Sequence, residues 1–170
     1  MGISGKSVLE KLLHVGAPSP LPPPRSVAGG AGVACSIGVN DVTFEDFHFW
    51  DLPFAANGIN YTSSQGRDVL SGNFTGCLMA SYKVGGEVRV CHVSTGPGQD
   101  CLPAWAALKA TAANIFEMRP SDQMNCGGAA LAYCYGLITS KYEFYAITVV
   151  QGAGGAGVKI AAVEKARLLR

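Results

Sequence analysis

The chain has 170 residues, of which 48% are hydrophobic and 15% are charged. These values are typical of one globular domain with a substantial core and exclude an intrinsically disordered protein. Thirteen basic and twelve acidic residues give a net charge of +1 without any basic block, which disfavours nucleic-acid binding. No apolar run has the length of a membrane-spanning helix, and the N-terminus lacks the features of a secretory signal. We therefore expect a soluble protein, whose export would need a route without a classical signal peptide.

The N-terminal segment, residues 1–32, is predicted to be separate from the rest of the chain. Within GKSVLEKLLHVG, the apolar residues fall on one helical face, and Gly16 suits the end of a short amphipathic helix. The run Pro18–Pro24 favours an extended, polyproline-like conformation, and a glycine- and alanine-rich run follows it. We interpret this segment as a helix and a Pro/Gly-rich linker in front of one domain, residues 33–170.

The next segments favour β-strands. Residues 42–50 are rich in strand formers, with a break in the alternation at Glu45-Asp46 that marks a bulge or a turn. Residues 53–66 are predicted to form a loop that contains a short strand around Ile59–Tyr61. The following segment, Asp68–Leu70, fits either a short strand or the start of a helix.

A β-hairpin is predicted between Leu70 and Ser94. Its turn is VGGE, residues 84–87, because consecutive glycines supply the positive φ angles that short hairpin loops require. If the flanking strands pair antiparallel around this turn, Cys77 and His92 lie at corresponding ends of neighbouring strands. We therefore expect the thiol and the imidazole to lie close together.

One long helix and further strands are expected downstream of the hairpin. Asp100 suits a helix N-cap with Pro103 in the first turn, and the alanine-rich spacing predicts a packed helix over Ala104–Met118. Two apolar runs, 129–138 and 142–150, are predicted to pair as strands, although the first also permits a helix. The last segment, VKIAAVEKARLLR, fits either a strand followed by a tail or one terminal helix. At least four strands with one long helix predict an α+β fold.

Cys77 and His92 are the candidate catalytic residues, a nucleophile and its base. A cysteine reacts as its thiolate, and a nearby histidine takes the thiol proton or holds the resulting ion pair. The Thr75-Gly76 step suits the position before a nucleophile, because glycine lets a substrate carbonyl approach the backbone and nearby N–H groups can stabilise an oxyanion. Such a site transfers an acyl group to sulfur and releases it to water, and amides are its natural substrates.

Structural roles compete with this interpretation for all the cysteines and histidines. The six cysteines stand at positions 35, 77, 91, 101, 126 and 134. We expect most of them to be reduced and buried, because cysteine is among the most buried residue types. Cys91 adjoins His92, but its side chain points to the opposite face of the strand. Among the remaining cysteines only Cys126, which precedes two glycines, is kept as a reserve nucleophile. His48 lies among aromatic residues and is expected to be structural. No CxxC pair is present and the three histidines are scattered, so we predict no metal and no cofactor.

The segment from Leu70 to Ser94 resembles a known catalytic hairpin. Phe74-Thr75-Gly76-Cys77, an apolar strand, a glycine-containing turn and a strand carrying His92 are similar to the active-site hairpin of the cytotoxic necrotizing factor catalytic domain and the related Burkholderia lethal factor. Those toxins carry a Leu-Ser-Gly-Cys motif and a histidine on the next strand, and they deamidate a specific glutamine in a host protein. Here Phe-Thr-Gly precedes the cysteine, whereas Leu-Ser-Gly, residues 70–72, comes earlier in the chain.

The resemblance implies a bacterial toxin or effector that deamidates glutamine in a protein partner inside a host or target cell. Cys77 would attack the carboxamide, ammonia would leave, and water would resolve the thioester to glutamate, with His92 as the acid and base. The fold implied is a two-sheet β-sandwich with flanking helices. The histidine of that family is oriented partly by a backbone carbonyl, and Ser71 is our candidate for the orienting role.

Two other functions stay open. A papain-like protease or a transglutaminase uses the same Cys–His chemistry. Those enzymes usually place the cysteine at a helix N-terminus, whereas Cys77 is expected to begin a strand. The third candidate is a non-catalytic binding module or inhibitor in which Cys77 is merely a buried core residue.

Overall fold

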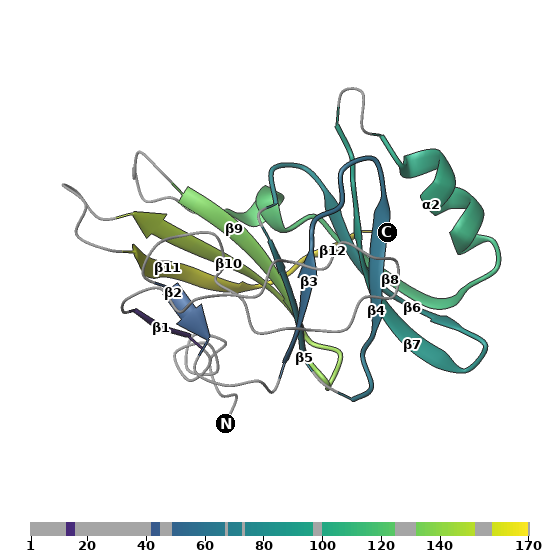
Figure 1. The fold of residues 1–170 in the computed structure, drawn as a ribbon, viewed down its shortest axis with the longest axis horizontal. Helices are drawn as coiled ribbons and strands as arrows, with labels where there is room; N and C mark the ends of the chain where they lie inside the picture. The colour runs from purple at the N-terminus through teal and green to yellow at the C-terminus, as the bar shows by residue number, and fades with distance from the viewer. Residues whose placement is uncertain are drawn as a thin grey trace.

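The computed structural model describes residues 13–15, 42–44, 49–66, 68–72, 74–96, 100–124, 132–151 and 158–169. Within these ranges, strands form two five-stranded sheets and a small two-stranded sheet, accompanied by one α-helix (Figure 1). All the strand pairs are antiparallel except one. The predicted single-domain α+β fold with β-sandwich-like sheets is therefore confirmed.

We call the two large sheets the β5 sheet and the β7 sheet. The β5 sheet contains, in spatial order, β11 (Val158–Lys165), β10 (Phe144–Gln151), β9 (Ala132–Ile138), β5 (Asp68–Gly72) and β3 (Phe49–Pro53). The β7 sheet contains β12 (Leu168–Leu169), β8 (Ala113–Met118), β6 (Leu78–Val84), β7 (Glu87–Val93) and β4 (Ile59–Ser63). The small sheet pairs β1 (Leu13–Val15) with β2 (Val42–Phe44). The helix is α2 (Leu102–Lys109), and a 3-10 turn spans Pro120–Gln123.

The predicted β6–β7 hairpin is confirmed. Val84 pairs with Glu87 across the turn, and Gly85 and Gly86 have φ angles of 57° and 90°. Such angles are easy only for glycine, which is why this dipeptide fixes the turn. The register that follows from it places Met79 directly opposite His92.

Several other expected strands are present. The segment 42–50 contributes β2 and the start of β3, while Glu45-Asp46 lies outside the described residues. The short strand expected around Ile59–Tyr61 is β4, and β9 and β10 form the predicted hairpin. Where the sequence left two possibilities, at Asp68–Leu70 and in the last segment, the chain forms strands β5, β11 and β12.

The helix predicted over Ala104–Met118 is wrong in its second half. The helix α2 ends at Lys109, the Thr111 hydroxyl donates to a carbonyl of the last turn, and Asn114 takes a φ angle of 51°. Residues 113–118 then form β8, which pairs with β6. This edge of the β7 sheet offers the backbone a row of hydrogen-bond partners, and that tertiary pairing outweighs the helix propensity of alanine.

The start of α2 differs from the prediction by one residue. Cys101, not Asp100, is the N-cap, and the proline lies in the first turn as expected. The Asp100 carboxylate still caps the helix, because its Oδ1 accepts the Leu102 N–H at 2.9 Å.

The prediction of an N-terminal helix is also wrong for those of its residues that the structure describes. Leu13–Val15 form β1, whose partner β2 lies beyond the expected linker. A strand partner distant in sequence competes with local helical spacing, and here it outweighs that spacing. The other residues of 1–32, the run Pro18–Pro24 among them, lie outside the described residues. The division at residue 33 stays a prediction.

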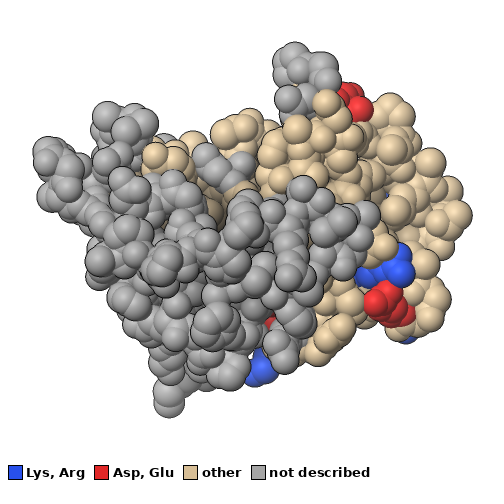
Figure 2. Space-filling model, viewed as in Figure 1, with Lys and Arg blue, Asp and Glu red and all other residues tan. Residues whose placement is uncertain are grey.

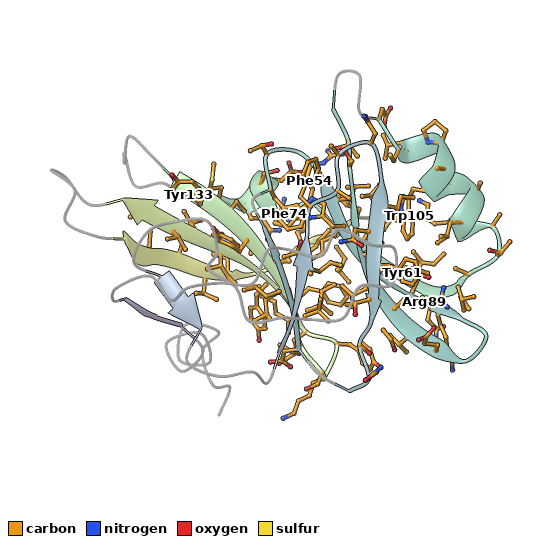
Figure 3. The ribbon with its side chains drawn as sticks, in the orientation of Figure 1. Phe54, Tyr61, Phe74, Arg89, Trp105 and Tyr133 are labelled. Atoms are coloured by element: carbon orange, nitrogen blue, oxygen red, sulfur yellow. The ribbon has the colours of Figure 1, made fainter. Side chains whose placement is uncertain are left out.

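The main core lies between the two large sheets. It contains buried residues from both, namely Leu52, Val69, Phe74, Cys77, Met79, Val90, Met118, Cys134, Ile138 and Phe144. A second core fills the space between the other face of the β7 sheet and α2, where Trp105 packs against Tyr82 (Figure 3). Alternation along β7 sends Cys91 to this second core, as predicted, and His92 to the layer between the sheets.

A tyrosine ring covers Gly72, the last residue of β5. Gly72 pairs with Tyr135 on β9, and a Cβ atom at Gly72 would collide with the ring carbons Cδ1 and Cε1. Gly72→Ala should therefore lower the free energy of unfolding by about 1–3 kcal/mol, measured by urea denaturation. Gly96→Ala is the matched control, because no atom of the described residues, its chain neighbours aside, lies within 4 Å of its added Cβ. Equal losses in the two variants would contradict this packing.

Candidate active site

The candidate site lies between the two sheets, near the connection that carries the chain from one to the other. Ser71 comes from β5, His92 comes from β7, and Phe74 and Cys77 belong to the segment between β5 and β6. All four side chains are buried. The sheets thus bring together groups that lie on different layers of the fold.

A hydrogen-bonded chain orients His92. The Ser71 hydroxyl donates to the Leu52 carbonyl at 2.5 Å, and its oxygen lies 2.8 Å from His92 Nδ1. A hydroxyl carries one hydrogen, so Ser71 Oγ accepts from His92 and Nδ1 is the protonated nitrogen. The other ring nitrogen, Nε2, therefore carries a free lone pair.

His92 is buried and neutral. Its exposed fraction is 0%, and Nε2 has no hydrogen-bond partner among the described residues. Burial lowers the pKa of His92 to about 3, because desolvation disfavours the charged imidazolium. At pH 7 the ring is therefore a neutral base with an unused acceptor.

Two phenylalanine rings enclose the imidazole. Phe74 stacks on it with ring centroids 4.1 Å apart and planes 15° apart. Phe54 lies at 5.3 Å with an interplanar angle of 59°. Figure 3 shows the two phenylalanines beside each other, between β9 and α2 in this view. This apolar enclosure is the physical cause of the low pKa of His92.

Cys77 shares the inner face of the β7 sheet with His92. Met79 is directly opposite His92, and Cys77 precedes Met79 by two residues, so alternation directs both side chains to one face. Cys77 is thus a diagonal neighbour of His92, and such neighbours in a sheet are about 7–8 Å apart. The Cys77 thiol donates to the Thr95 carbonyl at 3.9 Å, and within the described structure it makes no hydrogen bond to the ring of His92.

The predicted oxyanion residues lie in the turn before Cys77. Thr75 is exposed, and Gly76 is half-buried with a φ angle of 136°. The Thr95 hydroxyl donates to the Gly76 carbonyl at 2.8 Å. Because a trans peptide directs its N–H opposite to its C=O, this bond holds the Cys77 N–H on the side away from Thr95.

Thr95 is a site residue that sequence reasoning missed, as is Phe54. The Thr95 hydroxyl holds the peptide before Cys77, and the Thr95 carbonyl accepts the Cys77 thiol. The hairpin register could have identified Thr95. If the pairing of Leu78 with Val93 continues for two more residues, Gly76 lies opposite Thr95. Ser71 was predicted as an orienting group, and it contacts His92 directly.

The other candidates do not join this cluster. Burial raises the pKa of the Cys91 thiol, and its side chain lies in the core beneath α2. Cys126 and His48 lie outside the described residues. Cysteines 77, 91, 101 and 134 are free thiols.

Among the described residues, no group of three or more metal-ligating side chains is placed to hold an ion. In Figure 2, charged side chains on the described part of the visible face form scattered groups and no continuous basic patch.

Comparisons with protein families, with curated proteins and with solved structures find no match for this chain. Within the described ranges, no helix combines the length and apolar character needed to cross a membrane. The chemistry of the site is therefore argued from its own geometry.

Burial of His92 predicts a specific pH dependence of stability. The pKa of His92 is lowered from 6.5 to about 3 in the folded protein, so between these values the unfolded chain binds a proton that the folded chain does not. The free energy of unfolding should thus be unaffected by this group above pH 6.5 and fall by up to about 1.4 kcal/mol per pH unit below it. Urea denaturation at pH 7, 6, 5 and 4 measures the slope. His92→Gln should show a shallower slope, and parallel profiles would contradict the assignment.

Proposed function

We propose that this chain is a cysteine-dependent amidohydrolase that deamidates a glutamine side chain of a protein substrate. The observation that carries the proposal is the hydrogen bond from His92 Nδ1 to Ser71, which leaves Nε2 as an acceptor without a partner among the described residues, on the face that holds Cys77. A buried acceptor without a partner costs about 1–3 kcal/mol, so it calls for an explanation, and a catalytic role is one that fits this position. The resemblance of residues 70–94 to the deamidase hairpin supports the same chemistry.

In the first half of the proposed reaction, Cys77 Sγ bonds to the carboxamide carbon of glutamine. The thiol proton moves to His92 Nε2, and the carbonyl oxygen takes up the negative charge. The tetrahedral intermediate then collapses as Nε2 gives its proton to the amide nitrogen, so that the C–N bond breaks and ammonia leaves. For this step the Cys77 thiol turns from the Thr95 carbonyl towards His92.

In the second half, water resolves the thioester. His92 Nε2 takes a proton from the water while its oxygen attacks the thioester carbon, and the C–S bond then breaks. The proton returns to sulfur, which leaves glutamate and the free thiol. The overall reaction consumes one amide and one water and yields one carboxylic acid and one ammonia.

Three groups support these steps. Ser71 holds His92 in the tautomer that exposes the Nε2 lone pair, and its bond to the Leu52 carbonyl fixes the hydroxyl in turn. The Cys77 N–H is directed away from Thr95, where it can donate to the oxyanion of the intermediate. Positioning of this kind is what the backbone before a nucleophile contributes in acyl transfer.

Replacing the nucleophile is the decisive test. Wild-type protein incubated with a cell extract, or with a glutamine-containing peptide, should release ammonia and add about one mass unit to specific glutamines, whereas Cys77→Ser should do neither. Cys101→Ser is the control, because Cys101 is a free, half-buried thiol outside the proposed site. Mass spectra that are identical for wild type and Cys77→Ser would refute the deamidase function.

Thr95 supplies a second, graded test. Thr95→Val removes the hydroxyl that holds the Gly76 carbonyl, so kcat should fall by about 10- to 100-fold with KM nearly unchanged. Thr95→Ser keeps the hydroxyl and should restore most of the rate. If the serine variant were as slow as the valine variant, the hydroxyl would not be what orients the Cys77 peptide.

A second candidate function is a non-catalytic binding module. Cys77 has an exposed fraction of 6% and His92 of 0%, and this burial favours a structural role for both. A papain-like protease has less support, because Cys77 precedes a strand and not a helix. Release of ammonia from a glutamine-containing peptide separates the two leading candidates, since a binding module with a structural thiol releases none in either the wild type or the Cys77→Ser variant. The resemblance alone carries the further proposal that the deamidase is a bacterial toxin or effector acting inside a host or target cell.

A further inference from the structure

The two rings that enclose His92 differ in how firmly they are held. Phe74 is 1% exposed, belongs to the core between the sheets, and donates its backbone N–H to the Cys134 carbonyl at 2.8 Å. Phe54 is 39% exposed and follows the last residue of β3. One ring is therefore part of the core, whereas the other lies at the surface.

The backbone around Phe54 is a surface turn. The Gly58 N–H donates to the Ala55 carbonyl at 3.2 Å, and Asn57 takes a positive φ angle of 56°. This turn connects β3 in one sheet with β4 in the other. A partly exposed ring on such a turn can change rotamer on a fast timescale without repacking the core.

The exposed ring is in contact with a side chain that has no exposure. The ring centroids of Phe54 and His92 are 5.3 Å apart, yet 39% of Phe54 and 0% of His92 are open to solvent. Of the two rings that enclose the imidazole, Phe54 is thus the one that separates it from water. A substrate that approaches the imidazole past Phe54 must displace this ring.

We propose that Phe54 is the access gate of the Cys77–His92 site and that, once displaced, its ring forms the apolar wall against which the methylene stem of a neutral carboxamide side chain rests. This inference rests on the proposed function. Glutamine presents two methylene groups and an uncharged amide, both of which suit a site enclosed by Phe54 and Phe74. The glutamate product carries a charge that these rings do not solvate, so the same wall favours its release.

The gate is tested first without any substrate. Diethyl pyrocarbonate acylates unprotonated imidazole nitrogen, and mass spectrometry of proteolytic peptides resolves the reaction at His92 from that at the other histidines. At pH 7, Phe54→Ala should accelerate the modification of His92 by at least about tenfold, because the covering ring is gone. Phe54→Leu, which keeps an apolar cover, should stay within about threefold of wild type.

Phe116→Ala is the matched control. Phe116 is 43% exposed, close to the value for Phe54, and its ring centroid lies 6.1 Å from that of Phe144. It is therefore a similarly exposed phenylalanine outside the site. Its loss should leave the modification rate of His92 unchanged. Equal rates in wild type and Phe54→Ala, or equal acceleration in Phe54→Ala and Phe116→Ala, would overturn the gate. Circular dichroism of each variant confirms that the comparison is made on folded protein.

The wall is tested with a glutamine-containing peptide. Phe54→Ala should raise KM by about fivefold or more while kcat changes less, because the lost contact is made in the ground state as well as in the transition state. An unchanged KM would overturn the wall. If Phe54→Ala accelerates modification of His92 but no form of the protein, wild type included, deamidates any glutamine, the gate is supported and the proposed function fails.

Discussion

The structure depends on one buried polar contact between its two sheets. Ser71 belongs to the β5 sheet and His92 to the β7 sheet, and their hydrogen bond joins the two sheets beside the main apolar core. Burying these groups unpaired would cost several kcal/mol, so their hydrogen bond favours the stacking of the sheets that lets them meet. The same bond sets the tautomer of His92. One interaction thus contributes both to the packing of the two sheets and to the geometry of the candidate site.

Local rules predicted the fold where neighbouring residues decide the structure. The glycines of the β6–β7 turn require positive φ angles whatever surrounds them, so the hairpin could be inferred from sequence. Residues 113–118 show the opposite case. Their composition suits a helix, but the free edge of β6 converts them to β8. No local pattern contains that information, because the partner strand lies some thirty residues earlier in the chain.

The residues of the candidate site also differ in whether local sequence could predict their positions. The hairpin turn fixes the register, and the register alone places Cys77, His92 and Thr95 near one end of the β6–β7 pair. These residues were predictable in principle, although only the first two were named. The contact of His92 with Phe54 depends on how the turn between β3 and β4 folds over it. Sequence spacing cannot give such a contact, since it arises only after both sheets have packed.

Burial of His92 opposes the first proton transfer of the proposed reaction. The enclosure that lowers the pKa of His92 to about 3 also makes a resting imidazolium too costly to hold a thiolate at Cys77. Proton transfer from sulfur therefore becomes favourable only when a substrate carbonyl is in place to accept the electron pair and the Cys77 N–H is in place to stabilise the oxyanion. A site of this kind is unreactive towards water when empty. In the proposed reaction, binding of the substrate then depends on how well the entering amide replaces the contacts that Phe54 gives up.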